Sequence, residues 1–393
     1  MSPGITIYIF QYSYPHSNQY LLTLNSLLLN LNTLKKLFWK VIYSSLGIIS
    51  LISCNQNNKH ELKTTEEIVE HYSMKFLSDD RIHSVSIAIV ENNNEYTFHF
   101  GEQNPGKNNP PTDSTLYELA SVTKTFTGTM VAKAVLDGKI SLDDDIRKYL
   151  PEDYPNFEYN GEKITIKNLI THTGGFPNMI PTMANKNEFW EGLHQVTINS
   201  EPGTEFHYSN TAPEITAFIL EQAYGIQYQK LVQNFILSPN DMTNTKFNLN
   251  ERDKELLIQG YNGDNEPQEH YQNNLWGGIS GLHSNTLDLI KYIKYLLNDS
   301  IPEVKESHKN CFSTQYDFDI GYHWNIVKID GEICYRHHGG IWGMQNWFMV
   351  FPESNIGIAV LSNASFQGNL LSPGIDERLE DLALNIKKEL SAR

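Results

Sequence analysis

Ser121 and Lys124 are residues whose types and spacing could do chemistry. They stand three positions apart within residues 119–136, a stretch with few breakers that predicts a helix. Residues at this spacing share one helix face, so the hydroxyl and the amine would meet. A lysine with a depressed pKa can take the proton of a serine hydroxyl and make it a nucleophile. An ordinary helix surface could carry the same pair, so two later motifs must decide.

The two motifs are Tyr208-Ser209-Asn210 and His338-Gly339-Gly340. Residues 116–128, LYELASVTKTFTG, are similar to the nucleophile segment of class C β-lactamases. The first motif matches the tyrosine motif of that family, and the second lies where β-lactamases carry Lys-Thr-Gly. The chain therefore resembles the serine β-lactamase and penicillin-binding protein superfamily, on its class C-like branch, over residues 65–390. Supporting segments match in the correct order at 169–177, 202–204, 277–288 and 350–363.

The resemblance implies roles for the central residues. Ser121 would attack a carbonyl carbon and form an acyl-enzyme. Lys124 and Tyr208 would share the role of base, and which of them takes the proton stays open. A tyrosine needs its pKa of about 10 lowered first, and a nearby ammonium group does that. The backbone N–H groups of Ser121 and Ile341 would form the oxyanion hole.

Three further residues would support the substrate. Asn210 would line the cleft, and the alternative is that it is only a helix cap. Gly340 and its neighbour Gly339 would let a substrate backbone approach closely. His338 replaces a permanently charged lysine with a residue that is mostly neutral at pH 7, which leaves esterase, DD-peptidase and amide hydrolase activity open. The adjacent His337 would point to the opposite face of a strand and play a structural part.

The elements that must position these residues come from both ends of the chain. Alternating apolar residues predict a hairpin of early strands and a set of late strands, with a helical middle. We expect an α/β (α+β) fold: an antiparallel sheet of N- and C-terminal segments, flanked by helices, with a mostly helical insertion at about 115–265. The domain would span 64–393. The expected strands are 84–90, 96–100, 321–328, 333–337, 345–351 and 356–361, and the expected helices are 64–77, 121–136, 166–171, 210–224, 228–237 and 376–392.

The N-terminal residues have the layout of a bacterial secretory signal. Lysines at 35, 36 and 40 precede an apolar stretch at 41–53 that is too short for a membrane span, and Leu51-Ile52-Ser53-Cys54 resembles a lipobox. We expect 35–54 to be a lipoprotein-type signal with lipidation at Cys54, and 55–63 to be a tether. Residues 1–34 contain no Asp, Glu, Lys or Arg, so we expect them to be an extension upstream of the true start.

Composition limits the partners. The net charge of −16 and the lack of a Lys/Arg-rich run argue against nucleic acid. No metal or organic cofactor is implied, and we expect a monomer. Cys311 and Cys334 would be free to form a disulfide in an exported protein, a pairing that the sequence leaves open.

These observations predict an exported, lipid-anchored serine hydrolase of the cell envelope that acts on an ester or amide. D-amino-acid peptides of the cell wall, esters and β-lactams are the expected substrate types. The alternative is a penicillin-binding or sensor protein that is acylated without efficient turnover. The presence of Ser121, Lys124 and Tyr208 together argues against this alternative.

Overall fold

An eight-stranded antiparallel sheet forms the centre of the computed structural model, which describes residues 64–369 and 372–393. Its strand order is β2-β1-β13-β12-β11-β10-β9-β8. The early hairpin thus joins the late strands through the pairing of β1 with β13, in which Ala88 lies opposite Ala359. The sheet is built from both ends of the chain, as the sequence predicts.

The strands, with their bounds, are β1 (Ser84–Glu91), β2 (Asn94–Gly101), β3 (Tyr117–Glu118), β4 (Glu158–Tyr159), β5 (Glu162–Lys163), β6 (Tyr261–Asn262), β7 (His283–Ser284), β8 (Phe312–Ser313), β9 (Asp319–Gly321), β10 (Trp324–Ile329), β11 (Glu332–Ile341), β12 (Met344–Phe351), β13 (Ile356–Ser362) and β14 (Ala364–Ser365). The helices are α2 (Thr65–Phe76), α3 (Thr123–Leu136), α4 (Ile166–Ile170), α5 (Lys186–Leu193), α6 (Thr211–Tyr224), α7 (Tyr228–Val232), α8 (Glu251–Leu256), α9 (Thr286–Leu297), α10 (Pro302–Ser307) and α11 (Ile375–Ser391), with 3₁₀ turns η1 (Ala120–Val122) and η2 (Ile146–Tyr149) and a π-helical turn η3 (Gln233–Leu237).

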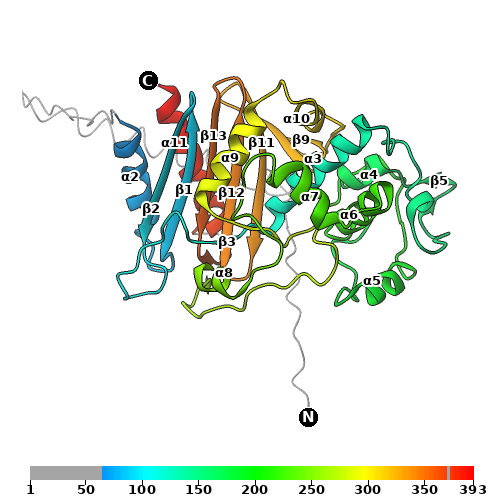
Figure 1. Cartoon of the computed structure of the whole chain (residues 1–393), viewed down its shortest axis with the longest axis horizontal. Helices are drawn as coiled ribbons and strands as arrows, with labels where there is room; N and C mark the ends of the chain where they lie inside the picture. The colour runs from blue at the N-terminus through cyan, green and yellow to red at the C-terminus, as the bar shows by residue number, and fades with distance from the viewer. Residues whose placement is uncertain (1–63, 370–371) are drawn as a thin grey trace, which may run out of the picture. The chain divides into compact units, whose positions relative to one another are not determined.

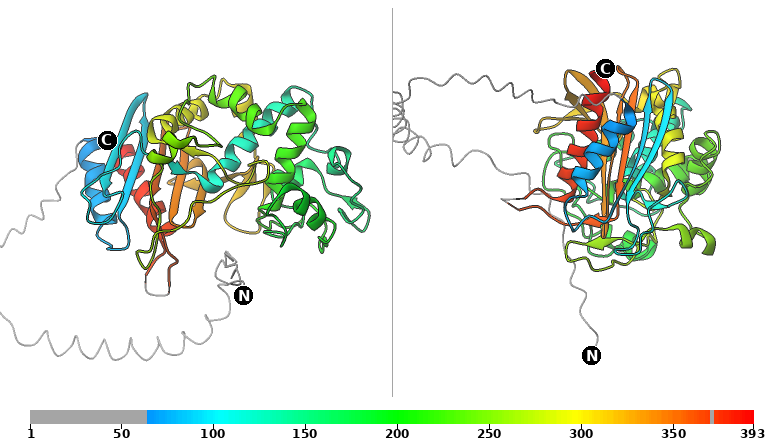
Figure 2. Two further views of the ribbon diagram at one scale, coloured as in Figure 1. Left: turned by 60° about the horizontal axis from the view of Figure 1, so that its bottom comes forward. Right: turned by 90° about the vertical axis from the view of Figure 1, so that its left-hand side faces the viewer.

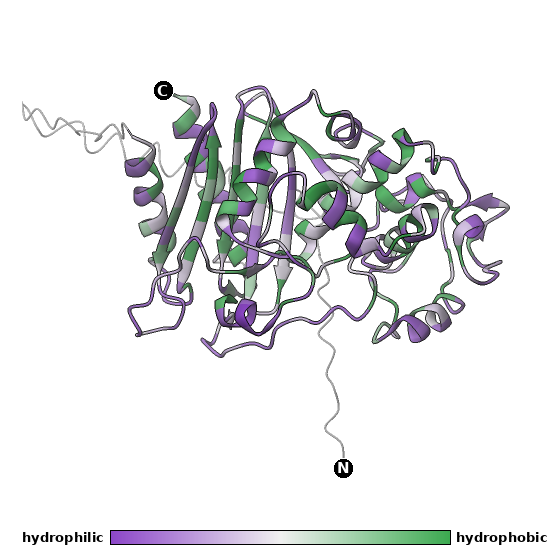
Figure 3. Cartoon of the chain, viewed as in Figure 1, coloured by the Kyte–Doolittle hydropathy of each residue, from purple (hydrophilic) through white to green (hydrophobic). Residues whose placement is uncertain are grey.

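Helices cover both faces of the sheet (Figures 1 and 2). On β12 the side chains alternate, because successive residues of a strand point to opposite faces. Phe348 and Val350 join the core shared with α9 and the helical region, whereas Met349 and Phe351 join the core under α2 and α11. Figure 3 shows apolar and polar residues interspersed along the helices that pack on the sheet.

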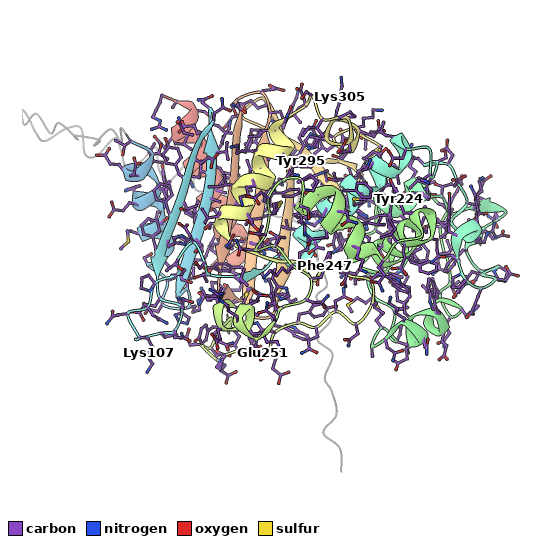
Figure 4. All side chains as sticks on the ribbon, in the orientation of Figure 1. Lys107, Tyr224, Phe247, Glu251, Tyr295 and Lys305 are labelled. Carbon is purple, nitrogen blue, oxygen red and sulfur yellow. The ribbon has the colours of Figure 1, made fainter. Side chains whose placement is uncertain are left out.

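The helical region lies beside the β11 half of the sheet and contains α3 to α7 (Figure 1). Its buried residues belong to the same apolar core as the α9 face of the sheet. Tyr224, labelled in Figure 4 at the end of α6, donates a hydrogen bond to Asp137 Oδ2 beside the end of α3 (2.7 Å). Phe247, also labelled, packs against Tyr228 of α7. The end of α3 is therefore fixed against α6 within the helical region.

Local sequence signals set several boundaries. Thr64 and Glu67 form the expected capping box at the start of α2. Three expectations were wrong in detail. The strand expected at 321–328 is interrupted by a turn at Tyr322 and His323, which separates β9 from β10. Ser121 lies in η1 rather than in the following α-helix, and His338-Gly339-Gly340 lies inside β11 rather than between two strands.

Cys311 and Cys334 are both free thiols, so the structure contains no disulfide between them. Cys334 is fully buried, and burial raises the pKa of its thiol to about 12. No helix within 64–369 and 372–393 is long and apolar enough to cross a membrane. The expected signal, tether and lipidation site at Cys54 lie outside the described residues.

Candidate active site

Ser121 stands where the chain turns from β3 into α3. The preceding residue, Ala120, has a positive φ of 46°, a conformation that costs a non-glycine residue energy and is often found at functional sites. The turn η1 holds Ser121 half-buried at the start of the helix, with its hydroxyl directed at two polar partners.

Lys124 lies one turn further along and is fully buried. Its Nζ donates hydrogen bonds to Ser121 Oγ (2.8 Å) and to the carbonyl oxygen of Ile279 (3.1 Å). Burial lowers the pKa of Lys124 to about 7, and the negative charge of Glu214 partly opposes that shift. Much of the amine is therefore neutral near pH 7, and a neutral amine at 2.8 Å can accept the serine proton.

Tyr208 approaches the same oxygen from the loop before α6. Its Oη donates a hydrogen bond to Ser121 Oγ (3.0 Å), and its ring centroid lies 5.2 Å from Lys124 Nζ. The structure thus brings the serine, the lysine and the tyrosine together at hydrogen-bonding distance.

Asn210 occupies the N-cap position of α6, but its side chain makes no capping hydrogen bond. That role falls to Ser209, whose Oγ accepts from the backbone N–H groups of Thr211 and Ala212. The Asn210 Nδ2 group donates to Asn178 Oδ1 (2.9 Å) instead, while its own Oδ1 is buried and has no hydrogen-bond partner among the described residues. Asn210 is therefore not the capping side chain, and its Oδ1 receives no hydrogen bond from the described residues.

The two histidines of β11 are placed the other way round from the expectation. Residues directly opposite on antiparallel strands share a face, and His337 pairs with Phe348 whereas His338 pairs with Trp347. His337 therefore lies on the α3 side, where the charge of Lys124 acts on it, and His338 packs against Trp347 on the α11 side. The assignment of His338 to the cleft and of His337 to structure is wrong.

Neither histidine replaces the lost cation. Burial lowers the pKa of His337 to about 3 and that of His338 to about 4, so both are neutral at pH 7. His337 Nδ1 lies 2.7 Å from the carbonyl oxygen of His338, which can only accept, so Nδ1 carries the proton and Nε2 presents a lone pair.

A second pair of buried histidines supports Tyr208 from behind. His172 Nδ1 accepts from the Ser209 N–H (3.2 Å), so its proton sits on Nε2, which lies 3.3 Å from His323 Nδ1. The His172 ring also packs against the Tyr208 ring, with centroids 4.8 Å apart. Burial lowers the pKa of both histidines well below its usual value, so this support is uncharged. His172 therefore holds the loop that carries Tyr208 and Ser209.

The glycines of β11 have different neighbours. A Cβ on Gly339 would lie 2.4 Å from the carbonyl oxygen of Leu119, so this glycine lets β11 press against η1. A Cβ on Gly340 would meet the side chain of Gln345, at 2.6 Å from Oε1, on the His338 side of the strand. Close packing of the protein backbone, rather than of a substrate, thus explains Gly339, and Gly340 lies away from Lys124. Ile341, the expected second oxyanion donor, lines a small cavity together with Ala120.

Comparison with known proteins decides the family. The sequence matches the Beta-lactamase family over residues 64–376. This chain belongs to the Beta-lactamase family. The match confirms the resemblance read from the motifs.

Relatives of this β-lactamase family member include Protein flp of Staphylococcus aureus strain MRSA252, 30% identical over 338 residues, which cover 82% of this chain and 66% of that protein. A Beta-lactamase of Providencia stuartii is 26% identical over 231 residues, 58% of this chain and 59% of the relative. The chain thus spans about two thirds or less of the length of these relatives.

Solved structures share the fold. A β-lactamase/D-alanine carboxypeptidase from Yersinia pestis, complexed with citrate, superimposes with a TM-score of 0.72 at 24% identity, covering 83% of this chain and 98% of that one. An octameric penicillin-binding protein homologue from Pyrococcus abyssi gives 0.71 at 23% identity, covering 83% and 77%. The expected antiparallel sheet with flanking helices is confirmed by these neighbours.

Another serine of this family member has a histidine and an aspartate aligned beside it. Ser86 Oγ lies 2.8 Å from His99 Nδ1, and His99 Nε2 lies 2.9 Å from Asp113 Oδ1. The Ser86 side chain is fully buried within β1, so no substrate carbonyl can reach it. This arrangement ties β1 and β2 to the loop before β3, and it provides a control serine for experiments on Ser121.

Sequence reasoning missed two groups of the site. His323 reaches the site through the turn before β10, and no motif marks it. Glu214 is a fully buried carboxylate whose charge acts on Lys124, and it resembles any other polar residue of a helix in the sequence. An acidic residue at a position where the helix period requires an apolar one was the signal available for Glu214.

Proposed function

We propose that the protein is a serine hydrolase that forms an acyl-enzyme on Ser121 and cleaves an ester or an amide. The observation that carries the proposal is the placement of Lys124 Nζ and Tyr208 Oη at 2.8 and 3.0 Å from Ser121 Oγ. Membership of the Beta-lactamase family supports the same chemistry in general.

In the proposed reaction the neutral amine of Lys124 takes the hydroxyl proton of Ser121 as Oγ attacks the substrate carbonyl carbon. Lys124 is favoured over Tyr208 because burial already holds its pKa at about 7. The negative charge that develops on the carbonyl oxygen would be stabilised by the backbone N–H groups of Ser121 and Ile341, where one such donor is typically worth about 10²–10³ in rate. The protonated Lys124 would return the proton taken from Ser121 to the leaving group through the Tyr208 hydroxyl, which regains the proton that it gives up. Water would then cleave the acyl-enzyme, releasing the acid and restoring the Ser121 hydroxyl.

The proposed substrates are D-amino-acid peptides, esters or β-lactams. The names of the relatives, which include a Beta-lactamase and a β-lactamase/D-alanine carboxypeptidase, support this range. His338 stands at the lysine position of the Lys-Thr-Gly motif of β-lactamases, and both it and the adjacent His337 are neutral, so this part of β11 offers a substrate carboxylate no permanent cation. A dedicated β-lactamase is therefore less favoured than an esterase or peptidase.

Turnover of p-nitrophenyl acetate and of a fluorescent penicillin by the wild type, Ser121→Ala and Ser86→Ala tests the proposal. We expect multiple turnovers of at least one substrate by the wild type and Ser86→Ala, and none by Ser121→Ala. A penicillin adduct that persists without turnover would instead assign the protein to the penicillin-binding or sensor class. Equal rates in all three proteins would remove Ser121 from the reaction.

We also propose that the protein is exported and anchored to the cell envelope through a lipid on Cys54. The basic, apolar and lipobox-like order of residues 35–54 supports this location. Incorporation of labelled palmitate by the wild type but not by Cys54→Ser would support the anchor. Equal labelling of the two proteins would contradict it.

A further inference from the structure

Glu214 is a fully buried carboxylate on α6 that accepts four hydrogen bonds from one loop, residues 273–279. Its Oε1 accepts from Asn273 Nδ2 (2.8 Å) and the Ile279 N–H (3.2 Å). Its Oε2 accepts from the N–H groups of Trp276 (2.9 Å) and Gly277 (3.1 Å). Four N–H donors converge on its two oxygens, and no acceptor within the described residues faces those oxygens, which is the hydrogen-bonding pattern of an acceptor-only carboxylate group.

The same loop holds Lys124 from the other side. The carbonyl oxygen of Ile279 accepts from Lys124 Nζ, and that of Gly278 accepts from Thr127 Oγ1 (3.1 Å each). A Cβ on Gly278 would lie 2.1 Å from the carbonyl oxygen of Pro213, so the loop packs directly against α6. The loop is therefore fixed between Glu214 on α6 and two side chains of α3.

The other groups near Lys124 carry no opposing charge. His172, His323 and His337 interact electrostatically with Lys124, and burial keeps all three neutral. Tyr208 presents its ring to the amine.

On the side of Glu214, the phenols of Tyr228 and Tyr271 feel its charge. Burial is the main cause that raises the pKa of both phenols, the charge of Glu214 adds to it, and both phenols are therefore protonated at pH 7. Among the described groups that interact with Lys124, Glu214 is thus the one that carries a negative charge.

We propose that Glu214 is a positioning residue for the acylation step: it holds the Ile279 carbonyl against Lys124 Nζ and keeps a fixed negative charge behind the amine. This inference rests on the proposed function. The carboxylate does not touch the substrate. It sets where the amine points and how readily the amine holds a proton.

The test measures the rate at which a fluorophosphonate probe labels Ser121 as a function of pH, in the full-length wild type, Glu214→Gln, Glu214→Asp and Asn273→Ala. Glu214→Gln removes the charge and places an NH₂ group among N–H donors, so labelling should slow by about 10–100-fold as the amine loses its position. The limb of the pH profile that reports Lys124 should also move to lower pH, because the charge that raises its pKa is gone.

Asn273→Ala and Glu214→Asp serve as matched controls. Each weakens the loop but keeps the negative charge, so each should slow labelling without moving the limb. A limb at the wild-type position in Glu214→Gln, or an equal movement in Asn273→Ala, would overturn the inference. Circular dichroism checks folding. If Glu214→Gln does not fold, the two control variants decide. Labelling at the wild-type rate in both would overturn the positioning role, whereas slower labelling with the Lys124 limb of the pH profile at its wild-type position would support it. A wild type that is never labelled would instead refute the proposed function.

Discussion

Ser121 Oγ has two partners at hydrogen-bonding distance, and they differ in how readily each can take its proton. Lys124 has lost its solvent shell, and burial has already brought its pKa to about 7. A phenol with an ordinary pKa of about 10 would be a base only after a much larger shift. At the scale of single residues, desolvation of one amine is the feature that would make this serine a nucleophile in the proposed reaction.

The first prediction concerns pH. Labelling of Ser121 by a fluorophosphonate should become faster as pH rises through about 7, because Lys124 loses its proton there and becomes a base. Stopped-time labelling in overlapping buffers measures the profile, and Lys124→Met should abolish the limb. A rate that falls over the same range would show that the ammonium form is required, and would assign the base role to Tyr208.

The second prediction separates the adjacent histidines. His337→Ala removes a ring from the cluster around Lys124, so acylation should slow by about 10-fold or more through misplacement of the amine. His338→Ala removes a ring that packs against Trp347 on the opposite face, so its main effect should be a loss of about 0.5–3 kcal/mol of unfolding free energy. Labelling rates and chemical denaturation of both variants make the comparison. A larger loss of rate in His338→Ala would reverse the assignment.

The motifs placed Ser121, Lys124 and Tyr208 in the sequence, because their spacing and order carry the information. They could not orient β11: two consecutive histidines differ only in which face each takes, and the pairing with β12 sets that. The role of Glu214 could not be predicted from the sequence for a related reason. Its meaning depends on a loop some sixty residues away that donates four hydrogen bonds to it.

At the scale of elements, the site depends on the contact between η1 and β11. The strand presents Gly339 to the carbonyl oxygen of Leu119, and Asn346 of β12 donates a weak hydrogen bond to the same oxygen (3.4 Å). η1 is thereby fixed against the sheet, and α3 begins from it. Ser121 is placed by a turn pressed on a strand.

The third prediction tests this contact. Gly339→Ala would put a methyl group 2.4 Å from backbone, so η1 must shift; we expect a loss of about 1–3 kcal/mol in unfolding free energy and a slower labelling rate. Gly340→Ala is the matched control, since its methyl group meets the flexible end of Gln345 and should cost less in both measurements. Equal effects of the two substitutions would contradict the role given to Gly339.

The sequence predicted the long strands of the sheet and six of the helices, because each carries a local signal, but it did not predict α5, α8, α9, α10 or the two-residue strands. The alternation of 84–90 and 96–100 gave the hairpin, and Thr64 with Glu67 gave the start of α2. Ser121 was assigned to the helix because the sequence of residues 120–122 does not distinguish a 3₁₀ turn from the first turn of an α-helix. The positive φ of Ala120 has no local signal either, since alanine normally avoids it.

At the scale of the whole molecule, the sheet joins both ends of the described chain. β1 and β13 pair directly, and α11 covers the face opposite the active site with buried side chains that include Leu379 and Ile386. Loss of packing under α11 should therefore destabilise the whole sheet, including β11, although the side chains under α11 make no contact with the site.

The fourth prediction follows from this arrangement. Leu379→Ala should lower the free energy of unfolding by about 2–5 kcal/mol, because it leaves a cavity in a fully buried position. The temperature at which Ser121 labelling is lost should fall with it, while the labelling rate at 25 °C stays near that of the wild type. Lys388→Ala, on the exposed side of α11, should change neither by much. If Leu379→Ala still labelled Ser121 at temperatures at which its sheet has unfolded, the proposed dependence of the site on the sheet would be contradicted.

The most direct measurement of the central claim is the mass of the protein after reaction with a fluorophosphonate, followed by peptide mapping. The account predicts a single adduct on the peptide that contains Ser121, absent from Ser121→Ala and retained in Ser86→Ala. An adduct on any other residue, or one that persists in Ser121→Ala, would contradict it.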